Sequence, residues 1–218
     1  MKFQNSRRTG VGAVLLLSLA GAVPPLHSQE GARPPQAIEA EATAKDLFAA
    51  GDYDKAVPVL ENALAANPGD LGDASLLAMA YLYSSSRLDQ TSNLDRAKAA
   101  MDKVIADGGE AVFLVGRGDD PMKFAAVHML KVIQGELRIG KDSITFVPSR
   151  SATGGVGPLT AADIKECGLN RTYGSDSAAF HLKLQKAVLN FRPLHFSRDE
   201  SDLVCALAAK YLGVRTAN

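Results

Sequence analysis

The chain of 218 residues contains no Trp, few aromatic residues and only two Cys. With aromatic residues at 6%, the sequence offers little for a surface that stacks on sugar rings. The chain has 24 Lys and Arg residues and 24 Asp and Glu residues. Because there is no excess of positive charge, the charge balance gives no reason to expect nucleic acid or an anionic membrane as a partner. The 46% hydrophobic content is ordinary for a globular protein.

A short apolar run, VGAVLLLSLA, occurs near the N-terminus at residues 11–20. It is too short to span a membrane comfortably. Three basic residues precede it, Lys2, Arg7 and Arg8, and the small residues AGA at 20–22 resemble a cleavage site. We therefore expect a signal peptide at 1–22, with an uncleaved N-terminal anchor as the alternative.

The chain after residue 22 has a small negative net charge and no further long apolar run. Without residues 1–22, Lys plus Arg falls from 24 to 21 against 24 acidic residues, a net charge near −3. No second long apolar run follows, so the mature chain is expected to have no integral membrane segment and to be periplasmic or secreted. Residues 23–36 are rich in Pro, Gly and Gln, which indicates a disordered leader.

Residues 37–109 carry a helical pattern in two similar units. In the first unit Ala44 and Leu47 share a helix face, Gly51-Asp52 breaks the helix, and a second helix runs from Tyr53 to the stop at Asn67-Pro68-Gly69. The pattern of Ala44 and Leu47 returns 34 residues later at Ala78 and Tyr81. A polar stretch within SSSRLDQTSN lengthens the turn of the second unit, whose second helix is expected at 94–106 and ends at Asp107-Gly108-Gly109.

This pattern resembles the tetratricopeptide repeat (TPR), a helix–turn–helix unit of about 34 residues. The small alanines at matching positions would let the paired helices approach closely, whereas an ordinary four-helix bundle is the alternative. Two repeats are fewer than the three usually needed to bury a continuous core. We therefore expect the segment that follows to cover the exposed end.

The second half changes from a helical period to a period of two. Residues 111–115 read as a strand within a connector at 110–130, which continues either as a short helix to about Leu130 or as an extended lead-in. The remaining expected elements are a hairpin at 131–147, a loop at 148–158, a capping box at Thr160 and Asp163 with one helical turn, a hairpin at 180–192 and a helix at 197–212.

Three stretches and the closing helix are similar to the pleckstrin-homology (PH)-like and GRAM-like barrels: GELRIGKDSITFVP, AADIKEC and AFHLKLQKAVLNFRP. The resemblance implies a small antiparallel sheet plugged by a helix over residues 131–218. The expected fold class is α+β, with two TPR-like helical hairpins followed by this sheet or barrel. The alternative is a generic α+β cap on the repeats.

No motif indicates a catalytic or metal site, so we expect no enzyme and no cofactor. His128, His181 and His195 lack ligand spacing, and His181 falls on the polar face of a strand, as a surface residue would. A hydrolase using Cys167 is the least favoured alternative. Cys167 and Cys205 either pair in an oxidising compartment or remain buried thiols.

The resemblance to TPR units implies a scaffold of the bacterial envelope that binds a protein or peptide partner in the groove along the first helix of each pair. Carried onto this chain, the groove side comprises Glu41, Lys45, Phe48, Ser75, Met79 and Leu82. For Phe48 and Leu82, packing in the core is an equal alternative. The alternative function is a ligand- or lipid-binding module built on the PH-like part.

Overall fold

The computed structural model describes residues 35–85, 91–118, 132–149, 154–170, 178–195 and 197–217. All of them belong to one compact unit, residues 33–218. The expected signal peptide and the expected short helix that follows Pro121 lie outside the described residues. Within the part that is described, no helix is long and apolar enough to cross a membrane.

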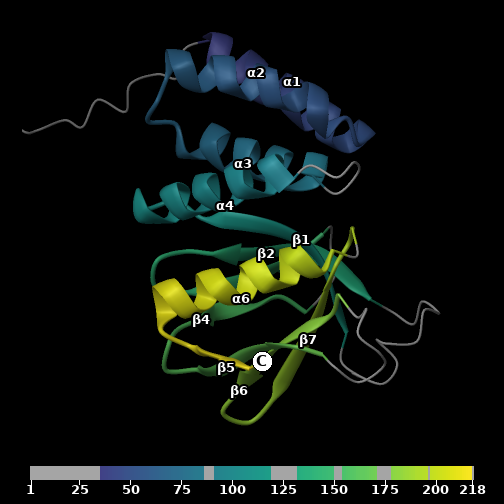
Figure 1. Ribbon diagram of the computed structural model, residues 1–218, viewed down its shortest axis with the longest axis vertical. Helices are drawn as coiled ribbons and strands as arrows, with labels where there is room; N and C mark the ends of the chain where they lie inside the picture. The colour runs from purple at the N-terminus through teal and green to yellow at the C-terminus, as the bar shows by residue number, and fades with distance from the viewer. Residues whose placement is uncertain are drawn as a thin grey trace, which may run out of the picture. The chain divides into compact units, whose positions relative to one another are not determined.

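Four helices in packed pairs make up the N-terminal part (Figure 1). They are α1 (Pro35–Ala50), α2 (Tyr53–Ala66), α3 (Leu71–Ser85) and α4 (Thr91–Ala106). Helix α1 begins at Pro35, inside the segment expected to be leader, because proline is well suited to the first turn of a helix. Helix α4 begins three residues before the expected Leu94.

The turn between α1 and α2 follows from its glycine. Gly51 has a φ of 73°, a left-handed conformation that glycine adopts without steric cost. Its amide donates to the carbonyl of Phe48 at 3.0 Å, and the amide of Asp52 donates to that of Leu47 at 2.8 Å. These bonds occupy carbonyls at the end of α1 and turn the chain back into α2, as the Gly-Asp signal predicts.

Small residues line the contacts between the helices. Ala44, Ala56, Ala78 and Ala97 are each at most 1% exposed. An alanine at such a position allows two helix backbones to approach closely, and larger buried side chains such as Leu60 fill the space between them. The four positions are those that the sequence pattern assigns to helix pairing.

In the part of the chain that is described, one mixed, mostly antiparallel eight-stranded sheet follows, with the strand order β4-β3-β2-β1-β7-β6-β5-β8. Within the described residues, neighbouring strands pair antiparallel except β5 and β8, which are parallel. The strands are β1 (Ala111–Gly118), β2 (Ile133–Ile139), β3 (Ile144–Pro148), β4 (Val156–Leu159), β5 (Ile164–Leu169), β6 (Phe180–Leu184), β7 (Val188–Pro193) and β8 (Arg215–Ala217).

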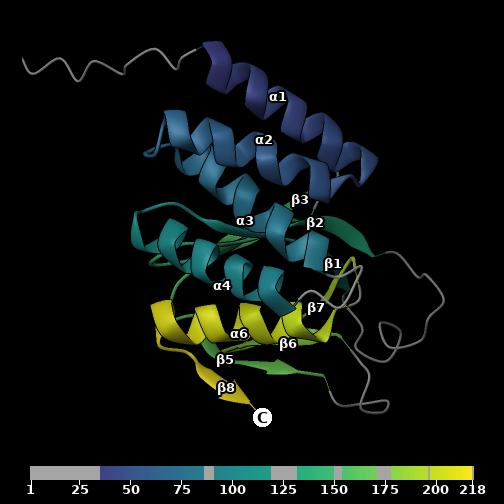
Figure 2. The same cartoon turned by 45° about the horizontal axis from the view of Figure 1, so that its top comes forward.

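Helix α6 (Arg198–Leu212) packs on this sheet, chiefly against β5, and leads into β8 (Figure 2). The hydroxyl of Ser197 accepts a hydrogen bond from the amide of Glu200 at the N-terminus of the helix. Gly213, with a φ of 67°, ends it. Both hairpins and this helix are confirmed.

Three strand assignments were missed from the sequence. Residues 148–158, expected to be a loop, contain most of β4, whose Gly157 and Pro158 are tolerated because β4 is an edge strand. The Thr160–Asp163 pair closes a single hydrogen-bonded turn, in which the amide of Ile164 donates to the carbonyl of Thr160 at 3.3 Å, and β5, which was not expected, follows it at once. Strand β8 has only three residues, and its pairing to β5 depends on where α6 ends.

Strand β1 joins the helices to the sheet. It packs against α3 and α4 on one side of the molecule and is hydrogen-bonded between β2 and β7 (Figure 1). Residues of the helices and of the sheet form one cluster of buried apolar side chains, including Ile105, Phe113 and Leu137, each 0% exposed. The segment after α4 therefore covers the end of the helical pairs, as expected.

Candidate functional site

A groove of about 440 Å³ lies where α1, α3 and the first two strands meet. We call it the α1–α3 groove. Its lining residues are Glu41 and Lys45 from α1, Leu71, Gly72, Ser75, Leu76 and Met79 from α3, Gly109 and Glu110 before β1, Val112 from β1, and Glu136 and Arg138 from β2. The hydroxyl of Ser75 donates to the carbonyl of Glu110 at 2.9 Å, which ties α3 to the turn before β1.

Four of the six residues expected on the partner-binding side line this groove: Glu41, Lys45, Ser75 and Met79. The other two lie outside it. Leu82 is only 3% exposed and packs in the core. Phe48 is partly buried and contacts Tyr53 edge to face, with ring centroids 5.1 Å apart. For these two residues the structure shows the packing role.

The wall formed by the sheet was not expected. Val112 comes from the stretch 111–115, which the sequence predicts as a strand, and Glu136 and Arg138 come from the polar face of the 131–147 hairpin, which was identified correctly. The sequence does not show which element this polar face meets. Its position opposite α1 and α3 depends on the packing of β1 against α3.

Charges in the groove are largely paired with one another. Lys45 contacts Glu41 at 2.5 Å, and Arg138 contacts Glu136 at 2.7 Å and Glu110 at 3.6 Å. The hydrogen bond to Glu136 is the main reason that the pKa of Arg138 is raised. Because each cation has a carboxylate beside it, the groove has little electrostatic preference for an anionic or a cationic ligand. The apolar side chains Leu71, Leu76 and Val112 are the contact surface that is left, beside Met79, which lines the groove but is only 6% exposed.

A buried polar junction connects α3 to β1 and α6. Tyr83 of α3 accepts a hydrogen bond on its Oη from the amide of Leu114 at 2.6 Å, and this hydroxyl donates to Oε1 of Glu200 at 3.4 Å. The ring of His195 lies 4.3 Å from the ring of Tyr83, and its Nε2 lies 3.3 Å from Oη of Tyr53. We call these five residues the junction.

The junction exists because β1 is only partly paired on its β7 side. The pairs with β7 run from Val115 to Gly118, so Leu114 lies just before the ladder. Its carbonyl accepts from the amide of Leu194, and its amide reaches Tyr83 instead of a strand. A buried backbone amide needs a partner, and the tyrosine hydroxyl supplies one.

The ionisation of the junction residues reflects their burial. Tyr83 and Glu200 are each 1% exposed. Burial raises the pKa of the Glu200 carboxyl to about 8, although the hydrogen bond from Tyr83 acts in the opposite direction. Burial also raises the pKa of Tyr83, with the nearby Glu200 as a second cause. The spacing of Ser197 and Glu200 is that of a capping box, but the glutamate side chain points to Tyr83, which the sequence does not reveal.

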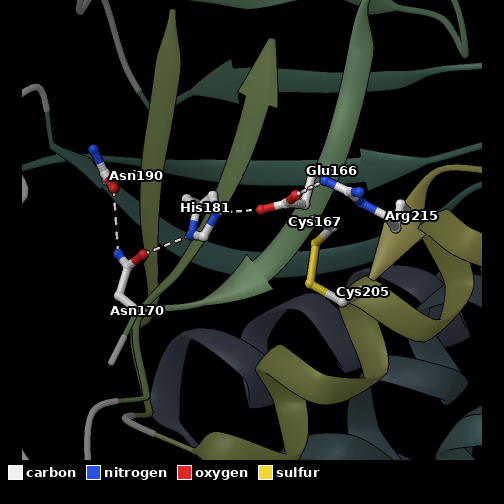
Figure 3. A network of polar contacts seen from close by, with 7 residues as sticks. All are labelled: Glu166, Cys167, Asn170, His181, Asn190, Cys205 and Arg215. Atoms are coloured by element: carbon white, nitrogen blue, oxygen red, sulfur yellow. Dashed lines mark hydrogen bonds and ion pairs between the residues drawn. A yellow bond between two sulfur atoms is a disulfide. The ribbon is translucent and has the colours of Figure 1, made fainter. Parts of the chain in front are cut away.

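A second polar network runs across the far strands of the sheet (Figure 3). Asn170 donates to Oδ1 of Asn190 at 3.2 Å, and Nδ1 of His181 lies 2.7 Å from Oδ1 of Asn170. Nε2 of His181 lies 3.5 Å from Glu166, which accepts from Arg215 at 2.6 Å. The hydrogen bond from Arg215 is the main reason that the pKa of Glu166 is lowered. The network joins β5, β6, β7 and β8, so His181 has a structural role beyond that of a surface residue.

Cys167 of β5 and Cys205 of α6 form a disulfide, with their Cα atoms 5.3 Å apart (Figure 3). The bond joins the helix to the sheet on the side opposite Glu166, which neighbours Cys167 in the strand. With its sulfur in this bond, Cys167 is not available as a nucleophile in the structure. A cavity of about 360 Å³ beside the disulfide is lined in part by Arg198, Ala206 and Thr216.

Another cavity, of about 690 Å³, lies between α4 and α6. Its charged lining residues are mostly paired: Asp102 with Lys210, Asp95 with Lys98 at 3.9 Å, and Asp202 with Arg198 at 3.9 Å. Within the described residues, no group of three or more His, Cys, Asp or Glu side chains is arranged to hold a metal ion.

Comparison with known proteins shows no family for this chain. No family model matches the sequence, and no curated protein matches it. Among solved structures, the C-terminal part resembles the N-terminal PH domain of human ARAP2, determined in solution. That structure matches with 11% sequence identity and a TM-score of 0.35 over 47% of this chain and 78% of that one.

Proposed function

We propose that the protein is a non-enzymatic interaction protein that binds an extended peptide segment of a partner protein in the α1–α3 groove. The observation that carries this proposal is the convergence of Glu41, Lys45, Ser75 and Met79 in one groove. The repeat pattern in the sequence predicts these residues by itself, and it contains no information about a cavity.

The helical part is TPR-like in this proposal. Its support is the burial of Ala44 and Ala78, 34 residues apart, and of Ala56 and Ala97 in the partner helices. In such units the first helix of each pair faces the ligand. Here α1 and α3 are these helices, and β1 with β2 takes the place of a further repeat at the open end.

The groove favours a particular kind of peptide. Leu71, Leu76 and Val112 provide an apolar contact surface beside the largely buried Met79, whereas the charges on the rim, three carboxylates and two cations, are mostly paired with one another. We therefore expect a peptide with one or two aliphatic or aromatic side chains and little net charge. Its affinity should depend weakly on salt, because few exposed charges change their surroundings on binding.

The location proposed is outside the cytoplasm, in the periplasm or medium of a bacterium. The disulfide of Cys167 and Cys205 supports this location, because such bonds persist in oxidising compartments. The export-like segment before residue 23 supports it from the sequence.

The experiment uses two tryptophan substitutions as a matched pair. A random peptide library is selected on the folded protein, and the affinity of a selected peptide is measured by calorimetry for wild type, Gly72→Trp and Gly69→Trp. Gly72 lines the groove, whereas Gly69 lies in the α2–α3 turn with nothing within 4 Å of an added Cβ. Both glycines are exposed and neither has a positive φ, so both variants should fold.

We expect Gly72→Trp to weaken binding at least tenfold, about 1.4 kcal/mol, and Gly69→Trp to leave it unchanged. Equal affinities for all three proteins would place the binding site elsewhere and refute the proposal. The proposal would also be refuted if no selected peptide bound specifically, that is, if free peptide in solution did not displace the same peptide displayed in the library.

A further inference from the structure

The junction lies directly behind the α1–α3 groove. Tyr83 follows the groove residue Met79 by one helical turn on α3, and Leu114 follows the groove residue Val112 on the same face of β1. The bond from the Leu114 amide to Tyr83 therefore connects the two elements that carry opposite walls of the groove.

Glu200 is the group that holds Tyr83 from the other side. Its carboxyl is almost fully buried in the first turn of α6 and contacts Tyr83 at 3.4 Å. The titratable groups at the junction are Tyr83 from α3, Tyr53 from α2 and His195 from the segment between β7 and α6. In the part of the chain that the structure describes, no Lys or Arg forms an ion pair with Glu200.

We propose that the buried side chain of Glu200, through its contact with Tyr83, is a latch that keeps α3 against β1 and so sets the shape of the α1–α3 groove. A neutral carboxyl is accommodated in this buried position, whereas a buried carboxylate without a cation is costly and is relieved when the junction opens to water. The consequence for ligands rests on the proposed function, but the latch itself does not.

The sign of the pH dependence follows from linkage. Burial raises the pKa of Glu200 to about 8 in the closed junction, from an ordinary value of 4.5. In that interval the closed junction holds a proton that the open junction has lost. Opening therefore becomes more favourable as pH rises, by about tenfold per pH unit between the two values, and levels off above about 8.

The test measures hydrogen exchange at the amide of Leu114, with each rate corrected for the intrinsic pH dependence of exchange. In the wild type, the protection factor should fall by one to two orders of magnitude, roughly, between pH 5.5 and 7.5. In Glu200→Gln, which keeps an oxygen acceptor for Tyr83 but has no proton to lose, protection should stay constant. Glu166→Gln, on the far strands, is the matched control and should retain the wild-type slope.

Two results would overturn the latch: protection at Leu114 that does not change with pH in the wild type, or a pH dependence that persists in Glu200→Gln. The second would assign the titration to His195 or another group.

The link to the groove has a separate signal, the methyl resonance of Met79. It should shift with the same pH profile as exchange at Leu114, and a resonance that stays fixed would show that the groove is not coupled. None of these measurements uses a ligand, so the latch can be confirmed or refuted whether or not a peptide binds in the groove.

Discussion

Replacing Glu200 by Gln should stabilise the protein at neutral pH, because the native carboxyl is almost fully buried and no Lys or Arg among the described residues forms an ion pair with it. The Gln side chain has nearly the same shape and keeps an oxygen to accept the hydrogen bond from Tyr83. What the substitution removes is the ionisation in the unfolded chain, which favours unfolding whenever the pH exceeds the unfolded pKa.

The size of the effect follows from the two pKa values. The Glu200 pKa is about 8 in the folded protein against 4.5 as its ordinary value. At pH 7, which lies roughly 2.5 units above the ordinary pKa, ionisation of this carboxyl stabilises the unfolded chain by about 3 kcal/mol. The folded chain, in which the carboxyl is still protonated, lacks this stabilisation. This contribution is absent below about pH 4.5 and complete above about pH 8, so stability from this group falls as pH rises.

Urea denaturation followed by far-UV circular dichroism measures the effect, since the chain has no Trp for fluorescence. The difference in unfolding free energy between Glu200→Gln and wild type should grow by roughly 3 kcal/mol from pH 4.5 to pH 7 at a constant m value. Glu166→Gln should behave in the opposite way. The pKa of Glu166 is lowered by Arg215, so its contribution is present at neutral pH and is lost as the pH falls. A Glu200→Gln difference that does not change with pH would refute the reasoning.

The remaining predictions concern the disulfide and the amide of Leu114. Replacing Cys167 and Cys205 together by Ala removes a cross-link over 38 residues and should cost about 4 kcal/mol of unfolding free energy, measured by urea denaturation under identical conditions; a loss below about 1 kcal/mol would show that the bond does not restrain the unfolded chain. Tyr83→Phe removes the acceptor of the Leu114 amide and should cost roughly 1–3 kcal/mol. It should also speed exchange at that amide, and a variant with unchanged stability and exchange would contradict the role of the hydroxyl.

Much of the fold was predictable because it depends on local pattern. Buried Ala44 returns 34 residues later as Ala78, and the hairpin of β2 and β3 alternates Leu137 and Ile139 with polar residues before a Gly-Lys-Asp turn. Helix α6 has an N-cap serine, a buried stripe and a terminal glycine. In each case a single segment contains its own signal, so no knowledge of the neighbours is needed.

The missed elements depend on partners that are distant in sequence. Strand β5 has a register irregularity between Ile164 and Glu166, which hides its alternation. Strand β8 is mostly exposed and has no apolar pattern, so only its contact with β5 defines it. The long-range contact of Tyr83 with Glu200 joins residues 117 positions apart, and no local rule predicts that a helix-capping glutamate turns inward.

The groove was predictable by half. The α1 and α3 side chains follow from the repeat pattern, but the repeat says nothing of what closes the end. Strands β1 and β2 provide that wall, so the place of Val112 and Arg138 in the groove follows only from the tertiary packing.

The most direct test of the central claim is where a selected peptide perturbs the methionine methyl groups. Met79 lines the α1–α3 groove, whereas Met101 is fully buried in α4 and serves as an internal reference. In a methyl NMR titration, we predict that the resonance of Met79 moves with peptide concentration and that of Met101 does not. Saturating peptide that leaves Met79 unmoved would contradict the account.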